Sequence, residues 1–231
     1  MVNRFKLPRS RRKPVVKKFK LATVVLLLKL FHALRRPAYK RILNRRFYLC
    51  PNVFDPLRTL TGKLLIKNTA LIEGDIVLDL GTGSGVIAVF LAEKAGKVIA
   101  TDISPAAVQC AKINADLNDR KEKIEVRQGN LFEPVKGEKF DLIVFNPPYL
   151  PGKARNLLEQ AWFDENQELI CKFFKQAGEF INPGGRIEIA YSNYGNIFQL
   201  EEIIGHFGFK FEVTAEMRTP FEIIYLYQVT A

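Results

Sequence analysis

The chain has 231 residues, of which 48% are hydrophobic, so it is long enough and apolar enough to fold as one domain with an appendage. Its three cysteines, Cys50, Cys110 and Cys171, lie about sixty residues apart without a Cys-x-x-Cys pair, which argues against a disulfide framework or a zinc site and favours a reducing compartment. The two histidines, His32 and His206, are too few to predict a histidine-based metal site or a Ser-His-Asp triad.

The net charge of +11 is unevenly distributed along the chain. Residues 1–50 hold sixteen Lys or Arg and no acidic residue, whereas residues 51–231 hold nineteen basic and twenty-four acidic residues. We therefore expect a basic N-terminal arm with an apolar helix at residues 1–52 and a mildly acidic domain at residues 53–231. Such an arm favours contact with a polyanionic surface, either RNA, as on a ribosome, or an anionic membrane.

Within the arm, residues 1–20 are too basic and too interrupted by proline to pack, so a flexible segment is expected. Leu21–Leu34 is an apolar run of fourteen residues, shorter than the roughly twenty that span a bilayer. It predicts either a helix packed on the domain or an interfacial membrane helix. A secretory signal is disfavoured because Arg35-Arg36 follow in place of a cleavage site. Residues 35–55 are predicted to link the arm to the domain, and we expect a cytoplasmic protein, with peripheral membrane attachment left open.

From Val53 onward, strand and helix patterns alternate, which predicts an α/β fold with a mostly parallel sheet, helices on both faces and an antiparallel pair of strands at the end of the chain. Strands are expected at Ile76–Leu80, Lys97–Thr101, Lys123–Arg127, Phe140–Phe145, Arg186–Ala190, Lys210–Met217 and Glu222–Val229, and helices at Leu57–Leu71, Val86–Lys94, Pro105–Leu117, Glu165–Ile181 and Ile197–Phe207.

Three glycines, Gly81, Gly83 and Gly85, follow the first of these strands. Without side chains they let the backbone approach a ligand, and the helix that follows offers free N–H groups. In open α/β sheets this position is the ligand crevice. The spacing G-x-G-x-G differs from the dinucleotide pattern, and the carboxylate of Asp79 would repel a pyrophosphate. A ligand with a cationic centre is therefore favoured over NAD.

Polar residues also follow the second and third of these strands. Asp102 can accept hydrogen bonds from both hydroxyls of an adenosine ribose, although it could instead cap the helix that begins near Ser104. Asn130 and Leu131 can frame an adenine, with Asn130 bonding the base and Leu131 covering its face. For Asn130 the alternative is the capping of a turn.

The strand Phe140–Phe145 runs directly into Asn146-Pro147-Pro148-Tyr149. The two prolines remove two backbone donors and fix two φ angles, so the strand must end there. One interpretation is a tight turn, because Asn-Pro is common turn chemistry. The other is a site that holds one amide side chain and one backbone carbonyl in fixed positions.

The motifs DLGTGSG, TDIS, GNLFEP and NPPY, in this order and spacing, resemble those of class I S-adenosylmethionine-dependent methyltransferases. NPPY resembles the HemK/PrmC branch, which methylates glutamine side-chain amides, and its relatives that methylate amino groups of adenine or guanine. The resemblance implies a Rossmann-like seven-stranded sheet with a terminal antiparallel strand, S-adenosylmethionine as cofactor, no metal and a monomer. It implies cofactor contacts from Asp79, Gly81, Thr82, Gly83, Gly85, Asp102, Ile103, Asn130, Leu131 and Asn146.

The same resemblance assigns catalytic roles to the corner. The side-chain carbonyl of Asn146 and the backbone carbonyl of Pro147 would accept the two hydrogens of the substrate nitrogen, Pro147 and Pro148 would hold them rigidly, and Tyr149 would stack on the substrate. The segment VFDP at Val53–Pro56 resembles the entry motif of single-domain relatives that modify the eukaryotic and archaeal release factor, so a glutamine in a release-factor-like protein is favoured over a base of RNA or DNA. Two departures from the family keep the alternative open. The arm is too short and too charged for the family's helical docking domain, and Trp162 is not followed by glycines.

Overall fold

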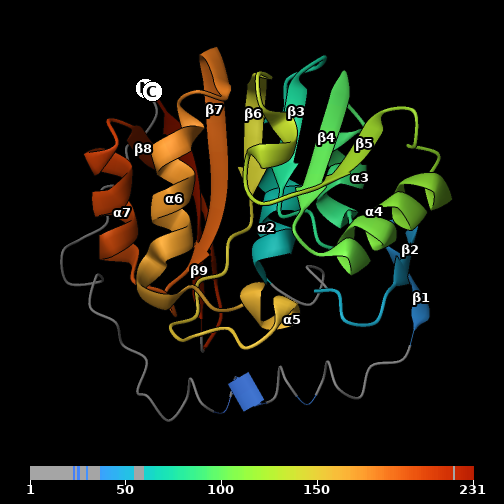
Figure 1. Cartoon of the computed structure of the whole chain (residues 1–231), viewed down its shortest axis with the longest axis horizontal. Coiled ribbons are helices and arrows are strands. Elements are labelled where there is room, and N and C mark those ends of the chain that lie inside the picture. Colours follow the sequence, from blue (N-terminus) through green and yellow to red (C-terminus); the bar gives the residue numbers. More distant parts are fainter. Residues whose placement is uncertain (1–22, 24, 27–29, 31–36, 55–59, 221) are drawn as a thin grey trace.

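The computed structural model describes residues 37–54, 60–220 and 222–231, together with Thr23, Val25, Leu26 and Leu30 (Figure 1). The predicted flexible segment at residues 1–20 and most of the apolar run Leu21–Leu34 lie outside the described residues, so the division of the chain at residue 52 stays a prediction. Within that run, the four described residues are helical: Thr23, Val25, Leu26 and Leu30. Among all described residues, no helix has both the length and the apolar character needed to cross a bilayer.

Seven strands form one sheet in the order β5-β4-β3-β6-β7-β9-β8. Neighbours from β5 to β7 pair in parallel, whereas β9 is antiparallel to both β7 and β8. The predicted fold class is confirmed, including the terminal antiparallel strand. The strands are β3 (Ile76–Leu80), β4 (Lys97–Asp102), β5 (Ile124–Gln128), β6 (Phe140–Phe145), β7 (Ile181–Ser192), β8 (Lys210–Arg218) and β9 (Ile223–Thr230).

Helices cover both faces of the sheet because its central strands are apolar on both sides (Figure 1). In β6, Leu142 and Val144 join one buried cluster with side chains of α2, α3 and α4, whereas Ile143 and Phe145 join another with side chains of α6 and α7. Because successive side chains of a strand point to opposite faces, β6 contributes side chains to the hydrophobic cores on both faces of the sheet. The helices are α2 (Leu60–Asn68), α3 (Val86–Leu91), α4 (Pro105–Leu117), α5 (Leu157–Gln160), α6 (Glu168–Ala177) and α7 (Ile197–His206).

The predicted boundary between the long helix after the corner and the fifth strand is displaced. The helix ends at Ala177, and β7 begins at Ile181 rather than at Arg186. Ile181 already pairs with Phe140 of β6, and the register then shifts before the regular ladder resumes. The Asn-Pro-Gly-Gly segment therefore lies inside an irregular strand and does not precede it, because an irregularity in the pairing accommodates its proline and glycines.

The prediction that residues 35–55 serve as a linker is wrong. Two strands, β1 (Ala38–Ile42) and β2 (Arg45–Leu49), pair as an antiparallel hairpin. Alternation along β2 buries Phe47 and Leu49, which are 0% and 6% exposed. Phe47 belongs to the core cluster shared by α2 and α3. The inward-facing aromatic residue attaches the hairpin to the domain.

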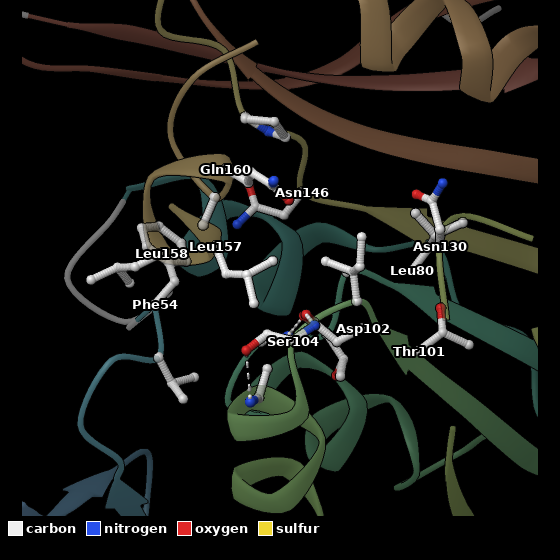
Figure 2. Close-up of a pocket in the computed structure, with 18 of the residues that line it drawn as sticks. Phe54, Leu80, Thr101, Asp102, Ser104, Asn130, Asn146, Leu157, Leu158 and Gln160 are labelled. Atoms are coloured by element: carbon white, nitrogen blue, oxygen red, sulfur yellow. Dashed lines mark hydrogen bonds between the residues drawn. The ribbon is translucent and has the colours of Figure 1, made fainter. Parts of the chain in front are cut away.

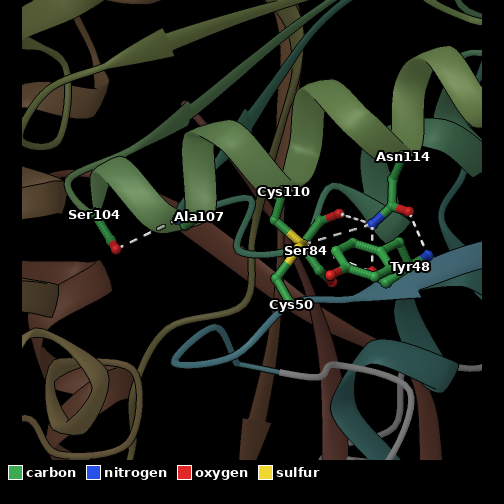
Figure 3. The surroundings of a disulfide bond; sticks show 7 residues. All are labelled: Tyr48, Cys50, Ser84, Ser104, Ala107, Cys110 and Asn114. Carbon is green, nitrogen blue, oxygen red and sulfur yellow. Dashed lines mark hydrogen bonds between the residues drawn. A yellow bond between two sulfur atoms is a disulfide. The ribbon is translucent and has the colours of Figure 1, made fainter. Parts of the chain in front are cut away.

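The expectation of unpaired cysteines is also wrong. Cys50, directly after β2, forms a disulfide with Cys110 of α4, with the two Cα atoms 6.0 Å apart (Figure 3). The two residues are separated by 60 positions in the sequence, so their proximity depends on the hairpin packing against α4. Cys171 is a free, exposed cysteine on α6.

Candidate active site

A cavity open to solvent lies at the carboxyl ends of four adjacent strands, β5, β4, β3 and β6 (Figure 2). This is the edge at which open α/β sheets bind their ligands. The cavity collects most of the predicted site residues, which come from the four turns that leave these strands. They are Gly81, Thr82, Gly83, Asp102, Ile103, Asn130, Leu131, Asn146 and Pro148.

The glycine-rich turn after β3 has three glycines with positive φ, but they serve two purposes. Gly81 and Gly83, at φ of 69° and 57°, line the cavity. Gly85 does not line it. A Cβ on Gly85 would lie 2.8 Å from the Cα of Ala111, so this glycine lets the start of α3 pack against α4. The turn thus exposes backbone to a ligand at its first two glycines and fixes its own position at the third.

Asp79 lies beneath this turn and is 1% exposed, so it does not line the cavity. Its carboxylate accepts a hydrogen bond from the hydroxyl of Thr82 at 2.6 Å, and Thr82 does line the cavity. Burial raises the pKa of Asp79 to about 7; the hydrogen bond from Thr82 opposes this shift, and the nearby charge of Asp102 adds a little to it. A carboxylate held in this way is stabilised by any cation that enters the cavity beside it.

Asp102 ends β4 and is fixed by two backbone donors. Its two carboxylate oxygens accept from the N–H groups of Ser104 at 2.8 Å and of Gly83 at 2.9 Å. Burial raises the pKa of Asp102, and these two bonds partly offset that effect. The side chain that caps α4 is Ser104, whose hydroxyl accepts from the N–H of Ala107. Each oxygen of Asp102 therefore retains acceptor capacity toward the cavity.

Asn130 and Leu131 form the wall of the cavity that follows β5. Leu131 has a φ of 47°, an uncommon conformation for a residue with a side chain. The backbone carbonyl of Asn130 closes this turn by accepting from the N–H of Glu133 at 3.0 Å. Since the backbone closes the turn, the exposed Asn130 side chain is not needed for capping.

The corner after β6 contains a buried acceptor that has no partner. Asn146 lines the cavity, and its Oδ1 atom is buried without a hydrogen-bond partner among the described residues. Pro147 and Pro148 are both buried, which holds the corner rigid. Figure 2 shows the Asn146 side chain beside Gln160 and apart from Asp102 and Ser104. A buried amide oxygen that lacks a partner costs stability, so this oxygen is available to a donor that enters the cavity.

Tyr149 lies behind the corner and is not part of the cavity wall. Its hydroxyl donates to the carboxylate of Glu222, at 3.2 Å, and its ring meets that of Tyr191 edge to face at 5.9 Å. Burial, followed by the charge of Glu222, raises the pKa of Tyr149 well above its ordinary value, so the hydroxyl stays protonated. Glu222 is a partner that the sequence did not indicate, because it lies 73 residues away.

Residues between the corner and α6 close the cavity from another side. The side chains of Leu157, Leu158 and Gln160, all from α5, line it. Sequence reasoning missed this helix, although Asn156 and Glu159 have capping-box spacing: the Asn156 side chain accepts from the N–H of Glu159 at 2.9 Å, and the Glu159 carboxylate accepts from the N–H of Arg155 at 3.0 Å.

The segment before α2 also contributes to the cavity. Asn52, Val53 and Phe54 line it, and they follow Cys50 directly in the chain. Asp55 and Pro56, which continue this segment, lie outside the described residues. The hairpin and the disulfide thus hold one wall of the cavity.

A family model described as "Methyltransferase small domain" matches residues 45–218. The chain belongs to this methyltransferase family. Among the relatives, a Methanocaldococcus jannaschii protein assigned as a protein N5-glutamine methyltransferase is 34% identical over 181 residues, covering 75% of this chain and 89% of that protein. The release factor glutamine methyltransferase of Aquifex aeolicus is 40% identical over 123 residues, which cover 51% of this chain and 43% of that enzyme.

Solved structures agree on the fold. A ribosomal protein L11 methylase from Lactobacillus delbrueckii subsp. bulgaricus has a TM-score of 0.59 at 25% identity, covering 76% of this chain and 80% of that one. The E. cuniculi Mtq2-Trm112 complex, described as responsible for the methylation of eRF1, has a TM-score of 0.57 at 19% identity, covering 77% and 98%.

These findings confirm the resemblance to HemK/PrmC enzymes. The chain is a methyltransferase whose cofactor is S-adenosylmethionine. The cavity fits that cofactor: it combines a glycine turn that admits close backbone approach, a fixed carboxylate in Asp102 and, in Asn146, an acceptor with no partner in the described part of the chain.

Proposed function

We propose that this enzyme methylates the side-chain amide nitrogen of a glutamine in a protein substrate. The observation that carries transfer to an amide or amino nitrogen is the buried Oδ1 of Asn146, an acceptor in the cavity wall that has no partner among the described residues. Within that class, a glutamine in a protein is the substrate we infer. The names of the M. jannaschii and A. aeolicus relatives support it. An amide nitrogen bears two hydrogens and therefore needs acceptors, which this corner offers.

The corner's role follows from the chemistry of the amide. Its nitrogen is a poor nucleophile because its lone pair is delocalised into the carbonyl. The Asn146 side-chain carbonyl and the Pro147 backbone carbonyl would each accept one hydrogen and favour a pyramidal nitrogen. The rigid prolines aim both acceptors before the substrate arrives, which lowers the entropy cost of the reaction. Methylation makes the nitrogen more acidic, so its proton can leave to solvent without a strong base.

The cofactor, when bound, supplies an electrophilic methyl group on a sulfonium. Asp102 would accept hydrogen bonds from the ribose hydroxyls with the capacity that Gly83 and Ser104 leave free. Asn130 and Leu131 would frame the adenine, and Ile103 would border it. Gly81, Thr82 and Gly83 would admit the amino-acid part, with Asp79 beneath Thr82 favouring its ammonium group.

Tyr149 receives a narrower role than the sequence indicated. Its hydroxyl is engaged by Glu222 and its ring by Tyr191. We infer that Tyr149 holds the corner in position from behind and does not stack on the substrate.

The second candidate is methylation of an amino group on an RNA base. The observation that favours it is the basic segment of residues 1–50, with sixteen cations and no acid. This segment would contact RNA or an anionic membrane surface by charge alone. An adenine or guanine amino group presents the same two hydrogens to the corner, so the corner does not distinguish the two substrates.

The deciding experiment supplies tritiated cofactor and the enzyme to protein and RNA fractions from cells that lack this enzyme. We expect labelled protein whose tryptic peptides carry one added methyl group on glutamine. Asn146→Ala should lower turnover about 100-fold while leaving cofactor affinity nearly unchanged, as for the loss of one oriented contact made in the transition state. Label confined to RNA would refute the glutamine assignment in favour of the second candidate.

A matched control is Asn182→Ala. Asn182 is also an amide, but it lies at the amino end of β7, where it donates to Asp141 at 2.7 Å. Its turnover should stay within about twofold of the wild type, as for most substitutions away from a site. An Asn146→Ala enzyme that keeps its turnover but loses the cofactor would show that the acceptor serves binding and not the reaction.

A further inference from the structure

The outer face of the β1–β2 hairpin carries a group of side chains that the methyltransferase reaction does not use. The strand register pairs Tyr39 with Tyr48 and Arg41 with Arg46, and directly opposed residues of an antiparallel pair project from the same face. Phe47 and Leu49 project from the other face and are buried. Two tyrosines and two arginines therefore share one face, which we call the Tyr-Arg face: Tyr39, Arg41, Arg46 and Tyr48. Tyr48 is half-buried against the cluster around the Cys50–Cys110 disulfide, whereas the other three residues are exposed.

The members of the Tyr-Arg face are stacked on one another. The Arg46 guanidinium lies 4.3 Å from the centroid of the Tyr39 ring, and the Tyr39 and Tyr48 rings are 5.2 Å apart. Tyr39 is 57% exposed, so its ring is accessible to a ligand. The Tyr39 ring and the Arg46 guanidinium are both planar, and nucleobases stack on planar groups of these two kinds.

The positive charge of this face is uncompensated. Arg45, on the inner face, pairs with Glu93 at 2.5 Å and lies over Phe90. In contrast, no carboxylate pairs with Arg41 or Arg46 within the part of the chain that the structure describes. Both arginines are exposed, in a segment of fifty residues without one acid. Phosphate groups are the natural counterions of such exposed, unpaired guanidinium groups.

The hairpin is also held rigidly, as a binding platform needs to be. The side chain of Asn114 accepts from the N–H of Tyr48 at 2.7 Å and donates to its carbonyl at 3.0 Å (Figure 3). The side chain of Asn118 donates to the carbonyl of Arg46 at 2.9 Å, and the Cys50–Cys110 disulfide closes the base. These contacts fix the backbone of β2 to α4, so little conformational entropy is lost when a ligand binds.

The same contacts connect this platform to the active site. The Asn114 amide also donates to the carbonyl of Ser84, in the glycine-rich turn, at 2.8 Å. From Cys50 the chain continues to Asn52, which lines the cavity. Figure 1 shows the hairpin at the same end of the molecule as α5. The Tyr-Arg face is therefore connected to the cavity through Asn114 and through the chain from Cys50 to Asn52.

We propose that the Tyr-Arg face binds single-stranded RNA, with bases stacked on Tyr39 and the Arg46 guanidinium and phosphates bound by Arg41. Single strands are favoured over duplexes because only unpaired bases expose their faces for stacking. This binding site is separate from the group that is methylated. An enzyme that methylates a protein would use this face to locate its substrate on an RNA-containing particle.

The test is fluorescence anisotropy with a labelled single-stranded oligouridine RNA and the full chain, over a range of salt concentrations. Tyr39→Ala should weaken binding about tenfold or more, the scale of one lost base–aromatic stack, while leaving the salt dependence unchanged. Arg41→Ala should reduce the slope of log affinity against log salt by about 0.7, the value for one phosphate on a single strand. Arg46→Lys keeps the charge but removes the planar group, and should resemble Tyr39→Ala.

Lys172→Ala is the matched control, since Lys172 is an exposed cation on α6, and it should change affinity less than about twofold. Cofactor binding by each variant verifies that it is folded. RNA affinity that is unchanged in both Tyr39→Ala and Arg46→Lys would overturn the proposal. Sedimentation with vesicles of phosphatidylglycerol and phosphatidylcholine tests the other polyanion: loss of vesicle binding without loss of RNA binding would assign the face to membranes. The result is independent of whether glutamine is the methylated group.

Discussion

Replacement of Asp102 by alanine tests the assignment of the cofactor pocket most directly. The carboxylate has one oxygen bonded to the N–H of Gly83 and the other to that of Ser104, so each oxygen has capacity for one further donor. A ribose offers two hydroxyl donors at the spacing of a carboxylate. One hydrogen bond to a charged group contributes roughly 1.5–3 kcal/mol, a factor of about 10 to 150 in affinity. Because Asp102→Ala removes acceptors for two hydroxyls, it should raise the Kd for S-adenosylmethionine by at least about 10-fold.

Isothermal titration calorimetry with S-adenosylmethionine and with its demethylated product measures this directly. Both ligands carry the same ribose, so both should lose affinity by the same factor. Asp102→Asn should be nearly as harmful, because its amide NH₂ would face one of the two backbone N–H donors that now bond the carboxylate. Asp116→Ala, which removes an exposed carboxylate from α4, serves as the control and should bind like the wild type.

A structural effect has to be separated from a binding effect, since Asp102 also holds Gly83 in place. The thermal midpoint without cofactor reports the first, and the increase of that midpoint on adding cofactor reports the second. An Asp102→Ala protein that melts normally and binds both ligands within about twofold of the wild type would refute the ribose assignment. Binding of NADH in place of S-adenosylmethionine would refute the identity of the pocket itself.

Two further predictions concern the glycine-rich turn. Gly85→Ala should lower the free energy of unfolding by about 2–4 kcal/mol in urea titrations, because the new Cβ would lie 2.8 Å from the Cα of Ala111 and because φ is 78°. Gly137→Ala is the control: its φ is 82° but nothing lies within 4 Å of the new Cβ, so it should lose only the backbone cost of about 1 kcal/mol. Equal losses in the two variants would contradict the packing role of Gly85. Burial raises the pKa of Asp79 to about 7 in the folded protein, so between about pH 4 and pH 7 the folded protein keeps a proton that the unfolded chain has lost. The contribution of Asp79 to the free energy of unfolding therefore falls over this pH range, by up to about 4 kcal/mol. Asp79→Asn should therefore flatten the decline measured by denaturation between pH 5 and pH 8, and parallel profiles for the two proteins would contradict the shift.

The sequence by itself determined the fold class and the chemistry of the cofactor pocket. Local sequence patterns predict both. These patterns are strands that alternate with helices, a glycine turn after β3, Asp102 after β4 and the proline corner after β6. Parallel strands place their carboxyl ends at one edge of the sheet, so residues that follow different strands meet there by topology alone. For that reason the structure places nine of the predicted site residues in one cavity wall.

The tertiary structure decided the contacts between residues that no local pattern relates. Cys50 meets Cys110 across 60 residues, and Tyr149 meets Glu222 across 73. The hairpin at residues 38–49 was not predicted, because its many basic residues were interpreted as a linker and the alternation that buries Phe47 and Leu49 was not recognised. A hydrogen bond or disulfide between distant segments depends on how helices and strands pack, and that packing is set by the whole core rather than by the residues that finally touch.

The distinction is clearest at Asn146. Its sequence context, between a buried strand and two prolines, was compatible with a plain turn or with a site. What separates the two is whether the side-chain oxygen finds a partner within the protein, since a turn-forming Asn bonds its own backbone. In the folded chain the Oδ1 of Asn146 is buried and has no partner among the described residues. Satisfaction of a buried polar atom depends on every neighbour that surrounds it, so only the three-dimensional structure could reveal it.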